Sequence, residues 1–196
     1  MGNFISKLFD KKKVIDIEKT QLEAKLSINN ALVDVELLTL AVNQNQIISL
    51  QDYLSNSTSV ELNEYLDLSK EIKNLESYIS AYQTIKGINL HLKFQNQIDK
   101  DFSFPIAPFI LFPLIQNAFQ FGYNSMEKYP IRVKLNTIGN KLKLEVSNRV
   151  NHHIQNQEST SLVKIYKSRL SLLYPNTHTL LINSNSILFK ATLIIE

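Results

Sequence analysis

The first half of the chain has the spacing of apolar residues that is typical of long helices. From about residue 15 to residue 54, apolar positions recur at intervals of three, four or seven, at Leu22, Leu26, Val33, Leu37, Leu40 and Ile47. A polar break at 55–59 contains Thr58, and Glu61 three residues later completes the pattern of a helix-capping box. A second helix is therefore predicted from about 59 to 86. It ends at Gly87, where a left-handed residue is favoured.

The second predicted helix carries an apolar stripe on one side. Its members are Leu68, Ile72, Leu75, Ile79 and Tyr82. Two long antiparallel helices with a short turn form a helical hairpin. A second copy of the hairpin would bury the exposed stripe most simply. We therefore expect dimerisation into a four-helix bundle.

After Gly87 the apolar period changes from helical to two, which indicates strands. Alternation is found at 88–94, at 131–136 and at 142–146, and the last two runs flank a turn at Gly139-Asn140. Helices are predicted at 106–124 and 161–174, a polar loop at 150–159, and two final strands at 180–183 and 187–195. The chain is thus predicted to be α+β, with a sheet and helices on one of its faces.

The predicted helix at 106–124 carries an unusual polar pair, Gln116 and Asn117, in the middle of an apolar run. A buried amide without a partner costs about 1–3 kcal/mol, so both side chains need hydrogen bonds. One interpretation is a core helix with a satisfied polar pair. The other is an edge that faces a ligand, and the pair itself favours neither.

Composition excludes some functions. The 196 residues contain no Cys and 4 Gly, which excludes disulfides and thiolate metal sites and disfavours a glycine-rich phosphate loop. A net charge of +3 with three Arg disfavours nucleic-acid binding. His152 and His153 are interpreted as part of a solvent-exposed loop rather than a metal site. No segment is long and apolar enough to cross a membrane.

The first 14 residues form a separate amphipathic segment with lysines on its polar side. Gly2 and Ser6 match the short myristoylation pattern, but an amphipathic start in water is the preferred interpretation. A weak contact of this segment with a membrane surface stays open.

Three later segments together resemble one family. The run 68–83, L-S-K-E-I-K-N-L-E-S-Y-I-S-A-Y-Q, is similar to the helix typically written L-x-x-E-I-x-x-L-x-x-Y-I. The run 106–122 is similar to the N box, I-x-P-x-x-L-x-P-x-x-E-N-A-x-x-H-G, and 168–175 to R-L-x-L-L-Y. In this order they resemble sensor histidine kinases of the LytS/YehU type, which are common in bacteria.

The resemblance implies a division of the chain into three parts. Residues 1–14 are the N-terminal segment, 15–86 the helical hairpin that serves as dimerisation and phosphoacceptor-like region, and 87–196 a GHKL ATPase-like domain. Such a domain implies a Bergerat-type α/β sandwich. The resemblance covers nearly everything from Leu22 to the end of the chain.

The chain departs from this family at the positions that carry its chemistry. Asn29 stands at the phosphoacceptor His position, and an acylated amide nitrogen is a poor nucleophile. Gln116 replaces the N-box Glu, and an amide accepts no proton at neutral pH. Gln120 and Phe121 replace a Lys and a His. Asn117 is kept, and the resemblance implies that it would hold Mg²⁺ if a nucleotide binds.

The nucleotide pocket implied by the resemblance is reduced to a remnant. Asn148 stands near the position at which the family has an Asp that binds adenine. The stretch 160–163, which matches the family's second glycine box, has no Gly. The loss of a charge-assisted bond costs about 1.5–3 kcal/mol. The remaining candidate nucleotide-binding residues are Asn117, Gln120, Gly122, Asn148 and Arg169. For Arg169 the preferred interpretation is that it braces its helix against the sheet or an acidic group.

The preferred interpretation is a degenerate two-component kinase without catalytic residues, acting by dimerisation and partner binding. We expect no cofactor, or at most weak binding of ATP and Mg²⁺. The expected partners are a second copy or an intact histidine kinase, and a response regulator. We expect a cytoplasmic location, with membrane association through a partner. The alternatives are an active or nucleotide-sensing histidine kinase with a non-standard site, and an unrelated helical adaptor.

Overall fold

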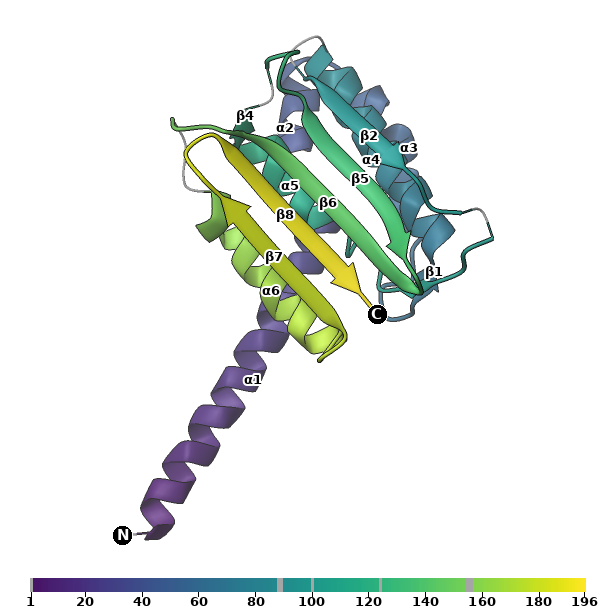
Figure 1. Cartoon of the computed structure of the whole chain (residues 1–196). Helices are drawn as coiled ribbons and strands as arrows, with labels where there is room; N and C mark the ends of the chain where they lie inside the picture. Colours follow the sequence, from purple (N-terminus) through teal and green to yellow (C-terminus); the bar gives the residue numbers. More distant parts are fainter. Residues whose placement is uncertain (1, 88–89, 100, 124, 154–156) are drawn as a thin grey trace.

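The computed structural model describes residues 2–87, 90–99, 101–123, 125–153 and 157–196, and the side chains from residue 16 onward. In this part of the chain the fold is α+β, with a six-stranded mixed sheet and helices packed on one face (Figure 1). The predicted fold class is thereby confirmed. The N-terminal segment 1–14 lies outside the described side chains, as do residues 88 and 89 of the first predicted strand.

The sheet has the strand order β2-β5-β6-β8-β7, and β4 pairs with the end of β6. The strands are β2 (Leu92–Asn96), β4 (Gly122–Tyr123), β5 (Ile131–Ile138), β6 (Lys141–Val150), β7 (His178–Ser184) and β8 (Leu188–Ile195). Only β2 and β5 run parallel. The predicted hairpin is confirmed as β5 and β6, and Gly139 supplies the positive φ that its turn requires.

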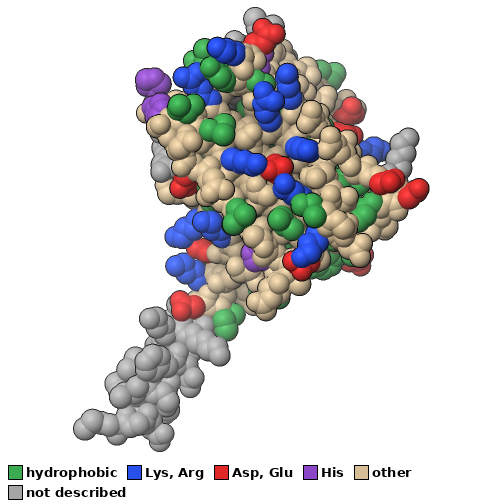
Figure 2. Space-filling model, viewed as in Figure 1, with side chains coloured by type: hydrophobic (Ala, Val, Ile, Leu, Met, Phe, Trp, Pro, Cys, Tyr) green, Lys and Arg blue, Asp and Glu red, His purple; other side chains and the backbone are tan. Residues whose placement is uncertain are grey.

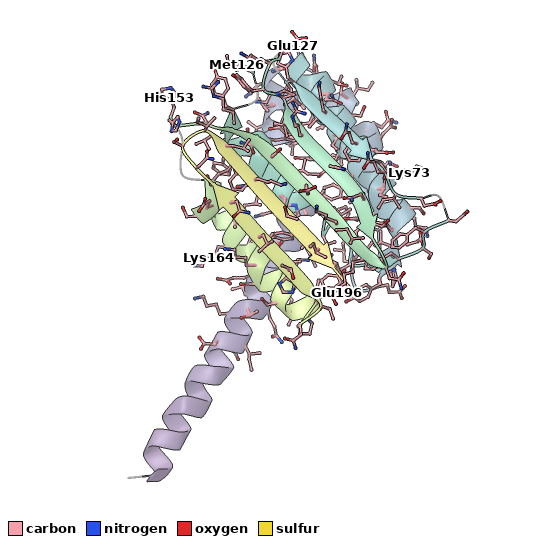
Figure 3. The ribbon with its side chains drawn as sticks, in the orientation of Figure 1. Lys73, Met126, Glu127, His153, Lys164 and Glu196 are labelled. Carbon is pink, nitrogen blue, oxygen red and sulfur yellow. The ribbon has the colours of Figure 1, made fainter. Side chains whose placement is uncertain are left out.

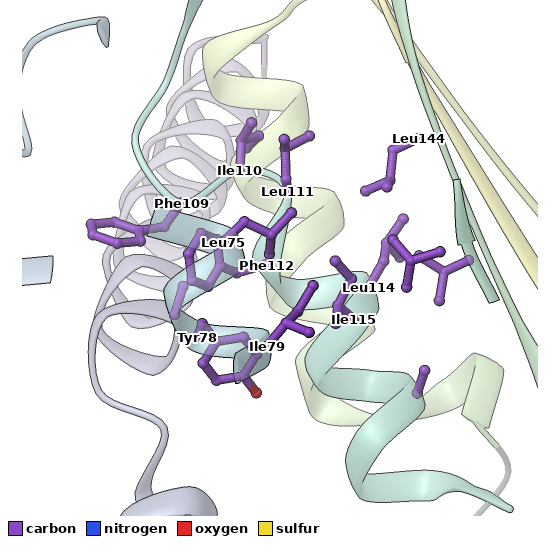
Figure 4. Packing of buried hydrophobic residues seen from close by; sticks show 14 of the residues in the cluster. Leu75, Tyr78, Ile79, Phe109, Ile110, Leu111, Phe112, Leu114, Ile115 and Leu144 are labelled. Carbon is purple, nitrogen blue, oxygen red and sulfur yellow. The ribbon is translucent and has the colours of Figure 1, made fainter. Parts of the chain in front are cut away.

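Three helices cover the inner face of the sheet: α4 (Leu68–Lys86), α5 (Phe112–Phe121) and α6 (Ser161–Leu173). Apolar side chains of α4 and α5 meet inward-pointing strand residues such as Leu144 in one core (Figure 4). A separate two-stranded sheet, β1 (Leu66–Asp67) with β3 (Pro105–Ile106), joins the start of α4 to the chain before α5.

The long first helix was predicted with wrong boundaries. The structure has α1 (Gly2–Leu32), α2 (Val35–Asn43), a 3-10 turn η1 (Ile47–Leu50) and α3 (Gln51–Thr58). Asp34 causes the first break, because its carboxylate caps Leu37 N–H at 3.1 Å and accepts the Tyr78 hydroxyl at 2.6 Å. Asn45, with a φ of 56°, follows α2 at the second break.

The predicted start of the second helix is also wrong. Thr58 ends α3 instead of capping a helix, and its hydroxyl donates back to Leu54 O at 2.8 Å. Helix α4 begins nine residues later than expected, because Asp67 is its N-cap and accepts from Ser69 N–H at 2.8 Å. The end of α4 at Gly87 agrees with the prediction, and Gly87 has a positive φ.

The helical hairpin is present in segments, because α2 and α3 pack against α4 while α1 packs against α6. The apolar stripe on α4, from Leu68 to Tyr82, is buried within this chain. The expectation that this stripe is exposed and is buried by a second copy is therefore wrong, although dimerisation itself stays a prediction. The division at 86/87 also stays a prediction, and α4 shares one hydrophobic core with α5 and the sheet.

The predicted helix at 106–124 is shorter than expected. Residues 107–111 form a loop in which Phe109 has a φ of 56°, and α5 starts only at Phe112 with a proline in its first turn. The predicted loop at 150–159 ends in a short 3-10 turn, η3 (Gln157–Ser159), and α6 follows it. Among the described residues, no helix is both long and apolar enough to cross a membrane.

Candidate functional site

Helix α5 brings the Gln116-Asn117 pair into the interior, between the sheet and α6. Both side chains are almost fully buried. Because the helix is apolar on its other sides, packing fixes it in place, and the amides are held by their own hydrogen bonds. Gln116 contacts α1, whereas Asn117 contacts the start of α6, so the two neighbouring amides are described separately.

Asn117 is hydrogen-bonded through its side chain and its backbone. Its Oδ1 accepts the Thr160 hydroxyl at 2.9 Å, and its Nδ2 donates to Gln157 O at 3.2 Å. Its backbone carbonyl accepts from Gln157 Nε2, also at 3.2 Å. Thr160 is the N-cap of α6 and accepts from Val163 N–H at 3.2 Å. Asn117 thereby ties α5 to η3 and to the start of α6.

Asn148 and Gln157 form a reciprocal amide pair. Asn148 Nδ2 donates to Gln157 Oε1 at 2.9 Å, and Gln157 Nε2 donates back to Asn148 Oδ1 at 2.9 Å. Asn148 Nδ2 also donates to Arg149 O at 2.8 Å. We call Asn117, Asn148, Gln157 and Thr160 the amide cluster. All four residues are buried, and the cluster carries no formal charge.

Gly122 closes the amide cluster at the end of α5. A Cβ atom there would lie 2.4 Å from Asn148 Nδ2 and 2.5 Å from Ala118 O. Any larger residue would have to displace both the amide and the helix backbone. Glycine is therefore needed at position 122 because α5 approaches β6 closely there. It is not needed for a left-handed conformation, since Gly122 has a negative φ.

Gln116 contacts α1 and does not contact the amide cluster. Its Nε2 donates to Asn30 O at 2.9 Å, while its Oε1 is buried with no hydrogen-bond partner in the described part of the chain. Asn29, which stands next to that carbonyl on α1, is exposed. The two positions at which the resemblance implies a His and an activating acid are thus near neighbours, and both hold amides.

Arg169 is buried but belongs to a different cluster. It donates from Nη1 to Phe109 O at 3.3 Å and from Nη2 to Pro108 O. Glu71 on α4 accepts from the backbone N–H of Phe109 at 2.9 Å and of Leu111 at 3.2 Å. We call Glu71 and Arg169 the loop clamp, because they hold both sides of loop 107–111.

Burial shifts the ionisation of the loop clamp. Desolvation raises the pKa of Glu71 to about 7, against the opposing effects of its two backbone donors and Arg169. Desolvation also lowers the pKa of Arg169 to about 10, and the nearby Glu71 opposes that shift. Arg169 lies nine residues, or about 13 Å of helix, from Thr160, so it braces the loop and does not join the amide cluster.

The structure thus brings together three of the five predicted pocket residues, Asn117, Asn148 and Gly122. Gln120 lies half-buried in the last turn of α5 and contributes no hydrogen bond to the cluster among the described residues. Sequence reasoning missed Gln157 and Thr160. Thr160 has the signature of an N-cap ahead of the predicted helix at 161–174, whereas no sequence signal marks Gln157.

The cluster offers little to acid–base or metal chemistry. Neither an amide nor an aliphatic hydroxyl has a pKa near neutral pH, so neither is suited to act as a general acid or base there. Mg²⁺ requires a near-octahedral set of oxygens, whereas Asn117 Oδ1 stands alone and already accepts from Thr160. Within the described residues, no group of three or more His, Asp or Glu is placed to hold a metal ion. As arranged, these residues do not fit a magnesium–nucleotide complex.

Comparison with known proteins gives remote similarities. No family model matches the sequence, and no curated protein matches it. Solved structures that are similar include the histidine kinase AdeS of Acinetobacter baumannii, at 13% identity and a TM-score of 0.48, over 92% of this chain and 96% of that chain. The catalytic domain of histidine kinase ThkA has 16% identity and a TM-score of 0.48, over 67% of this chain and 95% of that chain.

A third similar structure is the histidine kinase domain of the blue-light activated kinase EL346 of Erythrobacter litoralis. It has 11% identity and a TM-score of 0.47, over 91% of this chain and 95% of that chain. All three identities are low and all three TM-scores lie below 0.5. We therefore take no functional conclusion from these similarities.

Proposed function

We propose that this chain is a histidine-kinase-like signalling protein of the two-component type that does not phosphorylate itself and acts by dimerisation and partner binding. The observation that carries the proposal is the reciprocal pair between Asn148 and Gln157. Asn148 stands near the position of the adenine-binding Asp in the family that the sequence resembles. Its amide is engaged by a side chain of the same chain.

The amide pair disfavours nucleotide binding on energetic grounds. A carboxamide presents one donor beside one acceptor, as the edge of an adenine ring does. A nucleotide would have to break both hydrogen bonds of the pair, and each is worth about 0.5–1.5 kcal/mol. The total of about 1–3 kcal/mol corresponds to roughly a 5- to 150-fold loss of affinity. The absence of glycine from the second glycine box adds to this loss.

Phosphotransfer is disfavoured independently of nucleotide binding. The resemblance implies a His that attacks ATP and a Glu that activates it, and these positions hold Asn29 and Gln116. Gln116 donates to the backbone carbonyl that follows Asn29, so it acts as a tether between α5 and α1. An amide in either position supplies neither a nucleophile nor a base.

Dimerisation is supported by the open face of α1. Ala24, Ser27 and Ala31 are buried on the side toward α6, whereas Leu22 is 60% exposed and Leu26 is 44% exposed. With Asn29, these leucines follow the 4-3 spacing of a coiled-coil seam on α1. A second copy of this chain, or an intact histidine kinase with a matching helix, would cover this seam.

Calorimetry with ATP and Mg²⁺, together with the mass in solution, tests the proposal. We expect a dimer, no saturable heat, and no transfer of label from ATP to the protein. A Leu22→Glu, Leu26→Glu double variant is expected to be monomeric, and Lys19→Glu, which lies on the same helix, serves as the charge control.

Other results would favour the alternatives. Transfer of label from ATP to the protein would contradict the proposal and favour an active kinase. Micromolar ATP binding without such transfer would favour a nucleotide sensor. A wild-type monomer without ATP binding would favour a helical adaptor that uses the same seam for another protein.

A further inference from the structure

The outer face of the sheet, opposite the amide cluster, carries a concentration of cations. Side chains alternate between the two faces of a strand, so Ser147 and Arg149 point outward on either side of the inward-pointing Asn148. Lys and Arg side chains are spread over this face (Figure 2). They are found on β5, β6 and β8 and on the turn before β5.

A hollow of about 220 Å³ lies among these cations, beside the edge where β4 ends. Its lining includes Lys128, Arg132 and Arg149, with Tyr129, Ser147 and Leu188 between them. We call the three cations the cation cluster. Arg132 is the direct cross-strand partner of Ser147, and Arg149 lies two residues further along β6 on the same face. None of the residues that line the hollow is acidic.

The carboxylates that adjoin the cluster in sequence and along β6 form no ion pair with it in the described part of the chain. Glu145 accepts from Lys190 at 2.5 Å and from Lys143 at 3.0 Å, and those bonds take up both of its oxygens. Glu127 precedes Lys128 in the turn, at the rim of the molecule near Met126 (Figure 3). Among the described residues, no ion pair joins Glu127 or Glu145 to the cation cluster.

Tyr129 contacts two of the cations through its ring. The Arg149 guanidinium carbon lies 4.8 Å from the centre of the Tyr129 ring, and the Lys128 ammonium lies 5.4 Å from the same point. Both cations gain from the ring electrons. Like charges in one hollow repel, so a bound anion would reduce an unfavourable interaction.

We propose that this hollow is a binding site for the phosphate group of a small phosphate monoester. Arg132 and Arg149 supply planar forks that match a tetrahedral oxyanion, and Lys128 supplies a further charge. The Ser147 hydroxyl, opposite Arg132 and two residues before Arg149, is an additional donor. The hollow is large enough for a phosphate and a small organic body, which would lie on Leu188. This site is independent of the kinase-like function proposed above.

The test is a titration of the full chain with inorganic phosphate and with phenyl phosphate, followed by NMR of the backbone amides at 130–132 and 147–149. Saturable shifts confined to these amides are expected. Arg132→Gln and Arg149→Gln are each expected to weaken binding by at least about tenfold, because each removes a charge-assisted fork. Ser147→Ala is expected to weaken it less, and Arg149→Lys to restore part of the loss in Arg149→Gln.

Lys164→Gln is the matched control, because Lys164 is exposed on α6 and its loss changes the net charge equally (Figure 3). A change of less than about twofold is expected for this variant, since α6 covers the inner face of the sheet whereas the hollow lies on the outer face, and salt screens distant charges. Equal weakening in Lys164→Gln and Arg149→Gln would overturn the site, because the binding would then follow net charge alone. The absence of saturable shifts up to about 10 mM phosphate would overturn it as well. A Kd above about 10 mM corresponds to a binding free energy of less than about 3 kcal/mol.

Vesicles distinguish a soluble source of the phosphate from a lipid headgroup. Phosphatidylcholine vesicles with and without phosphatidic acid are added to the wild type and to Arg149→Gln. Binding of phenyl phosphate without vesicle binding supports a soluble monoester. Binding to phosphatidic acid vesicles that Arg149→Gln abolishes supports the same phosphate site with a lipid source, and vesicle binding that Arg149→Gln leaves unchanged counts against it.

Discussion

Two buried polar clusters lie on either side of α5, and they differ in how their polar groups are compensated for the loss of water. The amide cluster is neutral, and each of its side chains is paired with another or with backbone. The loop clamp places an acid and a base, Glu71 and Arg169, around loop 107–111. Because ionised groups cost more to bury than amides, the clamp should dominate stability, while the amide cluster should decide whether the site accepts a ligand.

The largest effect is expected when Arg169 in the loop clamp is replaced by Met. The change leaves the buried Glu71 without its nearby cation and two backbone carbonyls without their donor. Two hydrogen bonds from a charged donor are lost, each worth about 1.5–3 kcal/mol, so a loss of about 3–5 kcal/mol is expected. Urea unfolding followed by circular dichroism measures this loss. A loss below about 1 kcal/mol, the range of an exposed ion pair, would show that the clamp does not stabilise the loop.

The second effect is a pH dependence that arises from Glu71. Its pKa is raised from 4.5 to about 7 in the folded chain, so folding favours the protonated form. Glu71 therefore contributes its full share to the free energy of unfolding below about pH 4.5. This contribution, on the order of 3 kcal/mol, is lost as the pH rises through about 7.

Unfolding curves of the wild type and of Glu71→Gln between these pH values isolate that contribution. Glu71→Gln has no proton to lose, so the difference between the two curves should follow the predicted slope. Glu71→Gln is also less stable overall at low pH if its amide group faces a backbone donor, but this offset does not depend on pH. Parallel curves would contradict the raised pKa.

The third effect concerns Gly122 at the edge of the amide cluster. In Gly122→Ala the new methyl group would lie 2.4 Å from Asn148 Nδ2, with the backbone of α5 on the other side. Overpacking of this kind costs about 1–3 kcal/mol. Gly139→Ala is a useful comparison, because nothing lies near a methyl group there and only its φ of 59° is unfavourable. If thermal unfolding gives Gly122→Ala the same midpoint as the wild type, α5 can move away from β6 to make room for the methyl group.

The clusters also show what the sequence could and could not predict. The β5–β6 hairpin was predictable because alternation and Gly139-Asn140 are local signals. The end of α1 was not, because it depends on Asp34 meeting Tyr78, 44 residues away in sequence. The start of α4 was missed for a similar reason. Thr58 has the local capping pattern, but Asp67 is fixed by Ser103 across the β1–β3 pair.

The candidate site was partly predictable for the same physical reason. Asn117, Gly122 and Asn148 lie in segments whose order resembles a known family, so they were found together. Gln157 lies in an irregular segment, and its role depends entirely on the approach of η3 to β6. Arg169 was placed in the pocket by the resemblance, whereas its hydrogen bonds go to loop 107–111 and make it part of the loop clamp.

The smallest effect on stability is expected for Gln157→Ala, which removes the partner of Asn148. An amide left unpaired in the interior costs about 1–3 kcal/mol, and water entering the space would reduce this cost. The same change should strengthen any residual affinity for ATP, because no pair has to be broken. Thermal unfolding and calorimetry on this variant separate the two consequences. Weaker ATP binding than in the wild type would show that Gln157 helps to hold the ligand.

The most direct test follows the side-chain amide signals of Gln157 and Asn148 by NMR while the wild-type protein is titrated with ATP and Mg²⁺. The account predicts that both side chains show an NOE between their amide groups, and that neither signal moves as ATP is added. Saturable shifts of these two signals, with loss of their mutual NOE, would contradict it. They would show that the pair opens for a nucleotide and that the site is a working pocket.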